Sequence, residues 1–173
     1  MGDYVRRVIV GVDGSMGSLQ ALRHAAAVAR DHDATVHSVL VYSPPGGEGV
    51  ERRAPNSHLR KLWETTAHQR LRTAWDEALG GLPADLPATL TVASGFAGKV
   101  LVELATQEGD LLVIGAGSRA GIRRWLSRSV SRYCVSRARS RVLTVPSSVF
   151  ARELGHGLPR VLRHRRITRE LAG

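Results

Sequence analysis

Residues 115–131 combine glycines, serines and arginines, the residue types that bind phosphate groups. They follow Leu111–Ile114, four apolar residues whose length and composition are typical of a strand buried on both faces. The strand is expected to end at Gly115, with Gly117 in the loop and a helix beginning near Ser129. Glycines let a backbone approach an anion, and free N–H groups at a helix start favour negative charge. The pattern predicts a phosphate-binding loop, and a plain strand-to-helix crossover is the alternative.

A dinucleotide-binding fingerprint is the competing interpretation, because residues 115–120 match G-x-G-x-x-A directly after a strand. That fingerprint belongs to the first strand–helix unit of its fold, whereas this strand is expected to be the fourth. It also requires an acidic residue about 20 positions further on, and no acid occurs before Glu153. Both facts count against the dinucleotide fingerprint. A Walker A loop is absent, since no Gly-Lys-Ser/Thr occurs.

Catalytic and metal-binding residues are not predicted. No serine, cysteine or aspartate is paired by motif with a base, and the seven histidines lack metal-ligand spacing. The single cysteine, Cys134, lies beside Val130, Val135 and Ala138 in a helical pattern, which favours a small core residue over a nucleophile. The chain is expected to be a binding or signalling module and not an enzyme.

The net charge of +10 is concentrated in the second part of the chain. Residues 1–110 contain 11 Lys and Arg against 13 Asp and Glu, whereas residues 111–173 contain 14 against 2. This asymmetry indicates an anionic partner, which would be a nucleotide, a nucleic acid or an acidic protein. Because 23 of the 25 basic residues are arginine, a compositional bias without a binding role is the alternative.

No apolar run approaches the roughly 20 residues of a membrane span, and residues 1–12 do not form a signal peptide. A cytoplasmic protein with no membrane partner is expected.

Hydrophobic periodicity predicts alternating strands and helices. The expected strands are 5–12, 35–42, 88–93, 111–114 and 141–145, and the expected helices are 17–31, 56–79, 97–107 and 129–138. Ser15 is the expected cap of the first helix, and the second is expected to be amphipathic through Leu59, Leu62, Thr66, Leu71 and Trp75. This alternation favours an α/β fold with a parallel sheet, since parallel strands need crossovers. One domain over residues 1–146 is expected, followed by a basic, weakly helical extension at 147–173.

Several segments, in this order, resemble the universal stress protein family: Val-Asp-Gly-Ser at 12–15, Ser-Leu-Gln-Ala-Leu-Arg at 18–23, the loop opening at Gly115, Ser-Val-Ser at 129–131 and Val-Leu-Thr-Val-Pro at 142–146. The match covers roughly residues 4–146, and the ordered set is far more specific than any single piece. The resemblance implies a single-domain open sandwich, with a five-stranded parallel sheet of order 3-2-1-4-5 and helices on both faces. The resemblance and the chain order together place the cleft at the carboxyl ends of the first and fourth strands, where the strand order reverses.

One subgroup of this family binds ATP through a loop reading G-x2-G-x9-G-[S/T]. By resemblance Asp13 matches the acidic residue beside adenine and ribose, Val41 matches the strand-end residue whose backbone meets the base, and Gly115 or Gly117 matches the leading glycine. The resemblance therefore implies a nucleotide-binding set of Val12, Asp13, Val41, Gly115, Gly117, Arg128, Ser129 and Val130. ATP is the implied cofactor, with magnesium only if ATP is bound.

The motif is half present, because its internal glycine falls on Ser118 and its last glycine on Arg128, whereas Ser129 is kept. The arginine side chain would either block the pocket or hold a phosphate through a fork of charged hydrogen bonds. The resemblance thus implies a stress-response or signalling module that binds ATP or a related adenine nucleotide with weakened affinity. The alternative is an interaction protein that binds no nucleotide and whose basic half binds an acidic partner or nucleic acid. Slow ATP hydrolysis or autophosphorylation is the only enzymatic activity that the resemblance implies.

Many members of the family are dimers. The last strand would form a sheet edge in the family's strand order, so a homodimer paired through Val142, Leu143 and Val145 is expected. The alternative is that the basic tail covers the same edge and keeps the chain monomeric.

Overall fold

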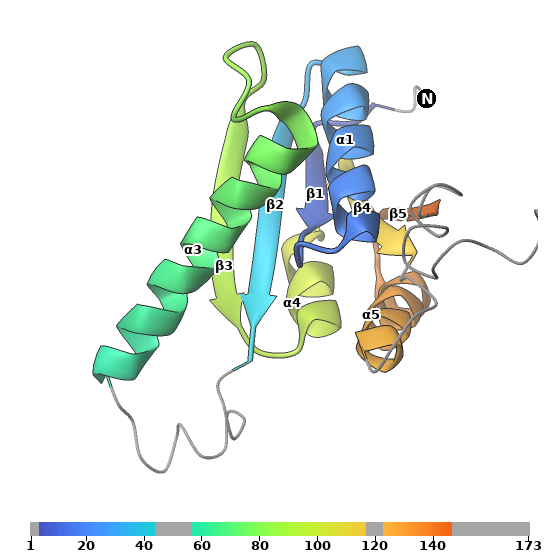
Figure 1. Cartoon of the computed structure of the whole chain (residues 1–173). Helices are drawn as coiled ribbons and strands as arrows, with labels where there is room; N and C mark the ends of the chain where they lie inside the picture. Colours follow the sequence, from blue (N-terminus) through green and yellow to red (C-terminus); the bar gives the residue numbers. More distant parts are fainter. Residues whose placement is uncertain (1–3, 44–56, 117–122, 147–173) are drawn as a thin grey trace, which may run out of the picture.

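The computed structural model describes residues 4–43, 57–116 and 123–146, with side chains described from Val130 onward in the last range. The predicted C-terminal extension, 147–173, lies outside the described residues, as does Gly117. The elements in chain order are β1 (Arg7–Gly11), α1 (Met16–Asp31), β2 (Thr35–Tyr42), α3 (Ser57–Leu79), β3 (Ala88–Ser94), α4 (Ala97–Leu104), β4 (Asp110–Ala116), α5 (Arg123–Arg137) and β5 (Arg141–Pro146) (Figure 1).

The strands form one parallel sheet in the order β3-β2-β1-β4-β5, which confirms the predicted fold. The first strand lies between β2 and β4, with Val8 beside both Val36 and Leu111. Successive crossovers therefore leave β1 in opposite directions, and the carboxyl ends of β1 and β4 lie next to each other. This is the position at which open α/β sheets place their ligands.

Helices cover both faces of the sheet and enclose two cores. One core packs α1 and α3 against the sheet, and its buried residues include Leu22, Ala26, Leu71 and Trp75. The other packs α4 and α5 against the opposite face, around Ile9, Leu101, Leu112 and Cys134. As predicted, the apolar residues Leu19, Leu22, Ala26 and Ala29 of α1 are all buried. The strands β1 and β4 contribute to both cores, which explains their nearly continuous apolar sequences.

A buried polar contact joins α3 to the two strands beneath it. The indole nitrogen of Trp75 donates to the Ser38 hydroxyl oxygen at 3.0 Å, and that hydroxyl donates to the Thr89 carbonyl oxygen at 3.1 Å. Trp75 and Ser38 are fully buried. Because each polar group has a partner, the network fixes α3 on β2 and β3 without leaving an unsatisfied donor.

The amino ends of β1 and β4 are joined by an ion pair. The Arg7 guanidinium donates to both carboxylate oxygens of Asp110, at 2.8 and 2.7 Å, and the Gln107 N–H donates to the same carboxylate at 2.8 Å. The Asp110 side chain is fully buried, whereas a quarter of the Arg7 side chain is exposed. The pair fixes β4 beside β1 at the end of the sheet opposite the expected cleft.

The N-terminal half of α3 differs from the prediction. Leu71 and Trp75 are buried as expected, but Leu59 is 39% exposed, Leu62 is 55% exposed and Thr66 is also exposed. The predicted amphipathic face is therefore wrong for this half. At 3.6 residues per turn, Leu59, Leu62 and Thr66 lie on the side of the helix turned away from Leu71 and Trp75.

Candidate functional site

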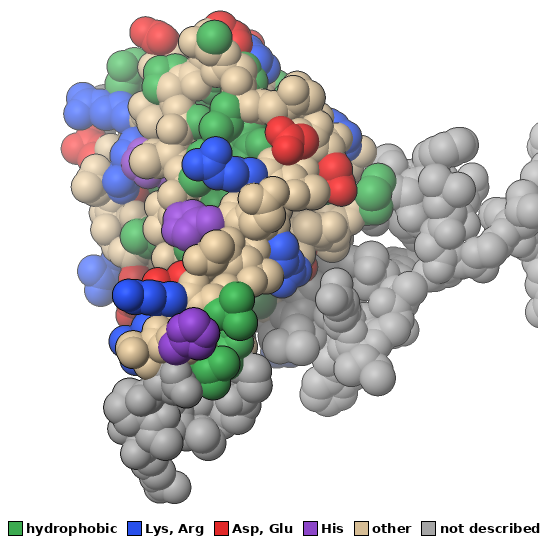
Figure 2. All heavy atoms as spheres, turned by 60° about the vertical axis from the view of Figure 1, so that its left-hand side comes forward, with side chains coloured by type: hydrophobic (Ala, Val, Ile, Leu, Met, Phe, Trp, Pro, Cys, Tyr) green, Lys and Arg blue, Asp and Glu red, His purple; other side chains and the backbone are tan. Residues whose placement is uncertain are grey.

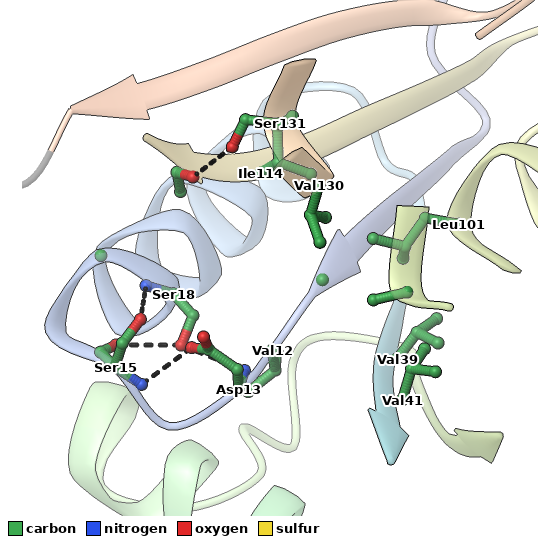
Figure 3. Close-up of a pocket in the computed structure, with 14 residues that line it drawn as sticks. Val12, Asp13, Ser15, Ser18, Val39, Val41, Leu101, Ile114, Val130 and Ser131 are labelled. Atoms are coloured by element: carbon green, nitrogen blue, oxygen red, sulfur yellow. Dashed lines mark hydrogen bonds between the residues drawn. The ribbon is translucent and has the colours of Figure 1, made fainter. Parts of the chain in front are cut away.

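A pocket lies at the carboxyl ends of β1, β2 and β4 (Figure 3). It contains about 580 Å³ of space free of protein atoms, part of which is open to solvent. Asp13 and Gly115 both line it, as the prediction of a cleft at the strand-order reversal requires. The described residues that line it are Gly11, Val12, Asp13, Ser15, Gly17, Ser18, Val39, Val41, Ala97, Leu101, Ile114, Gly115, Val130 and Ser131.

One side of the pocket is polar and is formed by the turn from β1 into α1. The Asp13 carboxylate accepts from the Ser15 N–H at 2.9 Å, and Gly14 between them has φ +79°. The Ser15 hydroxyl oxygen caps α1 by accepting from the Ser18 N–H at 3.2 Å, which confirms the predicted cap. The Ser18 hydroxyl donates to the Ser15 carbonyl at 2.9 Å. These contacts hold a carboxylate and the first turn of α1 against the pocket.

The opposite side is apolar. Val39 and Val41 come from the end of β2, Leu101 comes from α4, and Figure 3 shows these three side chains facing the space across from Asp13. The side chain of Leu101 also packs over Gly11, where a Cβ atom would lie 2.8 Å from the leucine Cδ1. A ligand that fits both sides needs a flat or apolar part joined to a polar part.

The sequence predicted that the loop would open at Gly115. The residue instead lies within β4, where it is paired with Val145 of β5. A Cβ atom on Gly115 would lie 2.6 Å from both the carbonyl carbon and the carbonyl oxygen of Gly17. The glycine is therefore required by the close approach of α1 to β4. This contact explains Gly115 without any bound phosphate.

The start of α5 also differs from the prediction. The helix begins at Arg123, whereas a start near Ser129 was expected. No glycine or proline interrupts residues 123–129, and Arg128 occupies the position of the family's last glycine, so the helix can continue through it. An N–H inside an α-helix donates to the carbonyl four residues earlier. The N–H groups of Ser129 and Val130 are therefore not the free helix-start donors that were predicted.

The pocket brings together most of the predicted residues. Val12, Asp13, Val41, Gly115 and Val130 line it. Arg128 and Ser129 are part of α5, but their side chains lie outside the described residues. Gly117 lies outside them altogether. Whether any of them binds a nucleotide stays a prediction.

Sequence reasoning missed the residues that α1, α4 and the middle of α5 contribute. Ser15 and Ser18 carried a signal, because they follow the acidic residue Asp13 by two and five positions at the start of a helix, but Ser15 was assigned only to capping. Ser131 donates to the Gly115 carbonyl at 3.0 Å and fastens α5 to β4 at the pocket wall. Ala97 and Leu101 carried no signal, since only the packing of α4 against the sheet places them there.

Cys134 is a core residue, as predicted. Its side chain is fully buried between α4 and α5, and its thiol donates to the Gly98 carbonyl at 3.8 Å. Burial raises the pKa of this thiol to about 11, so a reactive thiolate is disfavoured at neutral pH.

Within the described ranges, no helix combines the length and hydropathy of a membrane span. In the same part of the chain, no three His, Cys, Asp or Glu side chains are grouped so that they could hold a metal ion.

Comparisons with known proteins match this geometry to one family. The model of the universal stress protein family matches residues 5–146. A universal stress protein of Methanocaldococcus jannaschii, MJ0531, is 25% identical over 152 residues, and the match covers 81% of each chain.

Solved structures show the same fold. A universal stress protein in complex with cAMP is 27% identical, has a TM-score of 0.58, and is matched over 99% of its length and 84% of this chain. The protein UspA of Lactobacillus plantarum is 21% identical with a TM-score of 0.60, over 98% of its length and 82% of this chain. The family model spans all five strands and all four described helices, and the observed strand order is the one that the resemblance implied. The chain belongs to the universal stress protein family.

Proposed function

We propose that this protein is a stress-response or signalling module that binds an adenine nucleotide in the pocket between β1, β2 and β4. The observation that carries this proposal is the two-sided lining of the pocket, with Asp13 and the start of α1 facing Val39, Val41 and Leu101. A nucleotide has the same division, with an apolar, flat base joined to a polar ribose and phosphate. The relative solved with cAMP, at 27% identity, supports an adenine nucleotide in particular.

The lining suggests how the nucleotide would lie. The base would occupy the apolar side, against Val41 and Leu101, and the ribose hydroxyls would donate to the carboxylate of Asp13. The phosphates would then extend toward Gly115 and α5, because Ser131 and Val130 form that wall. Among the described residues of the lining, Asp13 is the one carboxylate, so it is also the group that would approach a magnesium ion carried in by ATP.

Phosphate binding is expected to be weaker than in relatives that keep the full glycine motif. The backbone N–H groups of Ser129 and Val130 lie inside α5 and would not be available to an anion. A cationic side chain would have to replace these N–H groups as the phosphate ligand. Arg128 is a candidate, because it precedes the pocket residue Ser131 by three residues, about one helical turn. We therefore favour the role of Arg128 as a phosphate ligand over its role as a plug.

Isothermal titration of the full chain with ATP, AMP, cAMP and adenosine tests the proposal, and GTP serves as the control for base identity. Binding of at least one adenine compound at sub-millimolar concentration, with weaker binding of GTP, would support it. If no adenine compound binds at millimolar concentration, the chain is an interaction protein without a nucleotide, which was the alternative.

Three further expectations stay predictions. The chain would act by binding and not by catalysis, with at most slow ATP hydrolysis or autophosphorylation. It would form a homodimer through β5, whose Leu143 is 36% exposed at a sheet edge, although Val145 is buried and would not reach a partner. The basic half would attract an acidic protein or nucleic acid, since Arg132, Arg137 and Arg139 are exposed and residues 111–152 contain no acid.

A further inference from the structure

The turn between β1 and α1 carries Asp13, the carboxylate of the candidate pocket, and this turn is exposed. Gly14, the next residue, has φ +79°, and apart from its chain neighbours no atom of the described residues lies within 4 Å of the place a Cβ would take. An exposed turn with little packing around it is easily deformed. The position of Asp13 therefore depends on its hydrogen bonds.

Two of these hydrogen bonds are local. The Asp13 N–H donates to the Ser18 hydroxyl oxygen at 3.3 Å, and the Ser15 N–H donates to the Asp13 carboxylate at 2.9 Å. Both partners lie within five residues of Asp13 and belong to the start of α1. These bonds set the conformation of the turn relative to the helix that follows it.

A third hydrogen bond comes from α3, 57 residues further along the chain. The Arg70 guanidinium donates to the Asp13 carbonyl oxygen at 3.1 Å. The next residue of α3, Leu71, is fully buried, as is Trp75 one helical turn later, so the backbone that carries Arg70 is fixed in the core. The guanidinium therefore joins the exposed turn to a rigid part of the fold.

Arg70 reaches the pocket only through Asp13 as the structure describes it. The arginine is exposed and is not among the described residues that line the pocket. Figure 2, with the α3 side turned forward, shows basic and acidic side chains interspersed over the described part of this face. This face does not favour an anionic partner, so the contact with Asp13 is what distinguishes Arg70.

We propose that Arg70 is a positioning residue for ligand binding. By holding the Asp13 carbonyl, it fixes the turn in the conformation that presents the Asp13 carboxylate to the pocket. The effect on a ligand rests on the proposed function, whereas the effect on the turn does not. A group held in place before binding requires no ordering when the ligand arrives. Loss of the guanidinium should therefore weaken those ligands that use Asp13.

Arg23 provides a matched control. It lies on α1 and donates to the Ala78 and Glu77 carbonyl oxygens near the end of α3, at 2.8 and 2.9 Å. It therefore also joins α1 to α3 through a guanidinium and backbone carbonyls, but about 7.5 Å beyond Ser18 along α1. Arg23→Met and Arg70→Met each remove one such tie and keep an unbranched side chain. Only Arg70→Met releases Asp13.

The first test needs no ligand and follows exchange of the Ser15 amide hydrogen by NMR, since this N–H donates to the Asp13 carboxylate. Arg70→Met should accelerate the exchange roughly two- to tenfold, the factor that corresponds to one net hydrogen bond. Arg23→Met should leave it unchanged. Arg70→Lys should restore most of the protection, because a single bond to a carbonyl needs only one donor. Unchanged exchange in Arg70→Met would overturn the proposal, whether or not a nucleotide binds.

The second test is calorimetric titration of the full chain with AMP and with 2′,3′-dideoxy-AMP, which lacks the ribose hydroxyls that Asp13 would bind. Arg70→Met should bind AMP roughly two- to tenfold more weakly than the wild type and the dideoxy compound equally well. In the Asp13→Asn background the same substitution should cause little further loss, because it acts through Asp13. Equal losses for the two nucleotides, or a full additional loss in that background, would overturn the positioning role. If the wild type binds neither compound, the proposed function fails, while faster Ser15 exchange in Arg70→Met still supports the hold on the turn.

Discussion

Gly17 of α1 and Gly115 of β4 meet so closely that a Cβ atom on Gly115 would lie 2.6 Å from the backbone of Gly17. The two glycines bring the first turn of α1 against the end of β4, and both line the candidate pocket. The contact is asymmetric, because a Cβ atom on Gly17 would lie 3.6 Å from the Ala116 carbonyl oxygen and 3.9 Å from the Ser15 hydroxyl oxygen, which are ordinary contact distances. The shape of the pocket therefore depends on a glycine in the strand more than on the glycine in the helix.

Alanine at these two positions should have opposite effects on stability. Gly115→Ala should lower the free energy of unfolding by about 1–3 kcal/mol, because the added methyl group overpacks two backbones that cannot both move. Gly17→Ala should leave it unchanged or raise it by up to about 1 kcal/mol, since alanine favours the helix and finds ordinary contact distances. Urea unfolding of both variants measures the difference. Equal destabilisation would show that the close approach has been misassigned.

Asp13 accepts a hydrogen bond in the turn before α1, and we propose that it also binds the ribose of a nucleotide. The Asp13→Asn variant separates these two roles. Asparagine keeps the side-chain oxygen that accepts from the Ser15 N–H but loses the negative charge. Adenine nucleotide affinity should fall about tenfold to a hundredfold, the effect of losing a hydrogen bond to a charged group, ~1.5–3 kcal/mol. Calorimetric titration measures the affinity, and thermal unfolding should change little. Wild-type affinity in Asp13→Asn would leave Asp13 with only the role of holding the turn.

Arg128→Gly tests whether a side chain has replaced the family's glycine as the phosphate-binding feature. If Arg128 holds a phosphate, the variant should bind ATP roughly ten to a hundred times more weakly. Arg132→Gly, one turn further along α5, controls for the cost of a glycine inside a helix, about 1 kcal/mol. Tighter binding of ATP by Arg128→Gly would instead identify the arginine as a plug.

The sequence predicted the elements and the strand order better than it predicted the site. Period-two and period-3.6 patterns act over short distances, and they located every strand and helix to within a few residues apart from the start of α5. The sequence could not show why residue 115 must be glycine. The backbone that a Cβ atom there would strike belongs to Gly17, almost 100 residues away in the chain. The exposure of Leu62 could have been predicted. Leu62 is nine residues before Leu71, which places the two side chains on opposite sides of the helix.

The thiol of Cys134 should be unreactive in the folded protein. With a pKa of about 11, only about one thiol in a thousand is ionised at pH 8, and the side chain is also fully buried. Reaction with an aromatic disulfide reagent at pH 8 should therefore be slow in buffer and rapid in denaturant, where the pKa returns to its ordinary value. Rapid labelling of the folded protein would contradict the packing of α5 against α4.

Occupation of the pocket by an adenine nucleotide is the central claim, and a pair of alanine-to-leucine variants tests it most directly. Ala97 lines the pocket at the start of α4, whereas Ala27 is exposed on α1 and does not line it. Ala97→Leu adds side-chain volume where the base would lie and should reduce the affinity for ATP and cAMP at least tenfold in calorimetric titration. Ala27→Leu should bind both as the wild type does. Equal affinities in the two variants, or no binding by the wild type at millimolar nucleotide, would contradict the account.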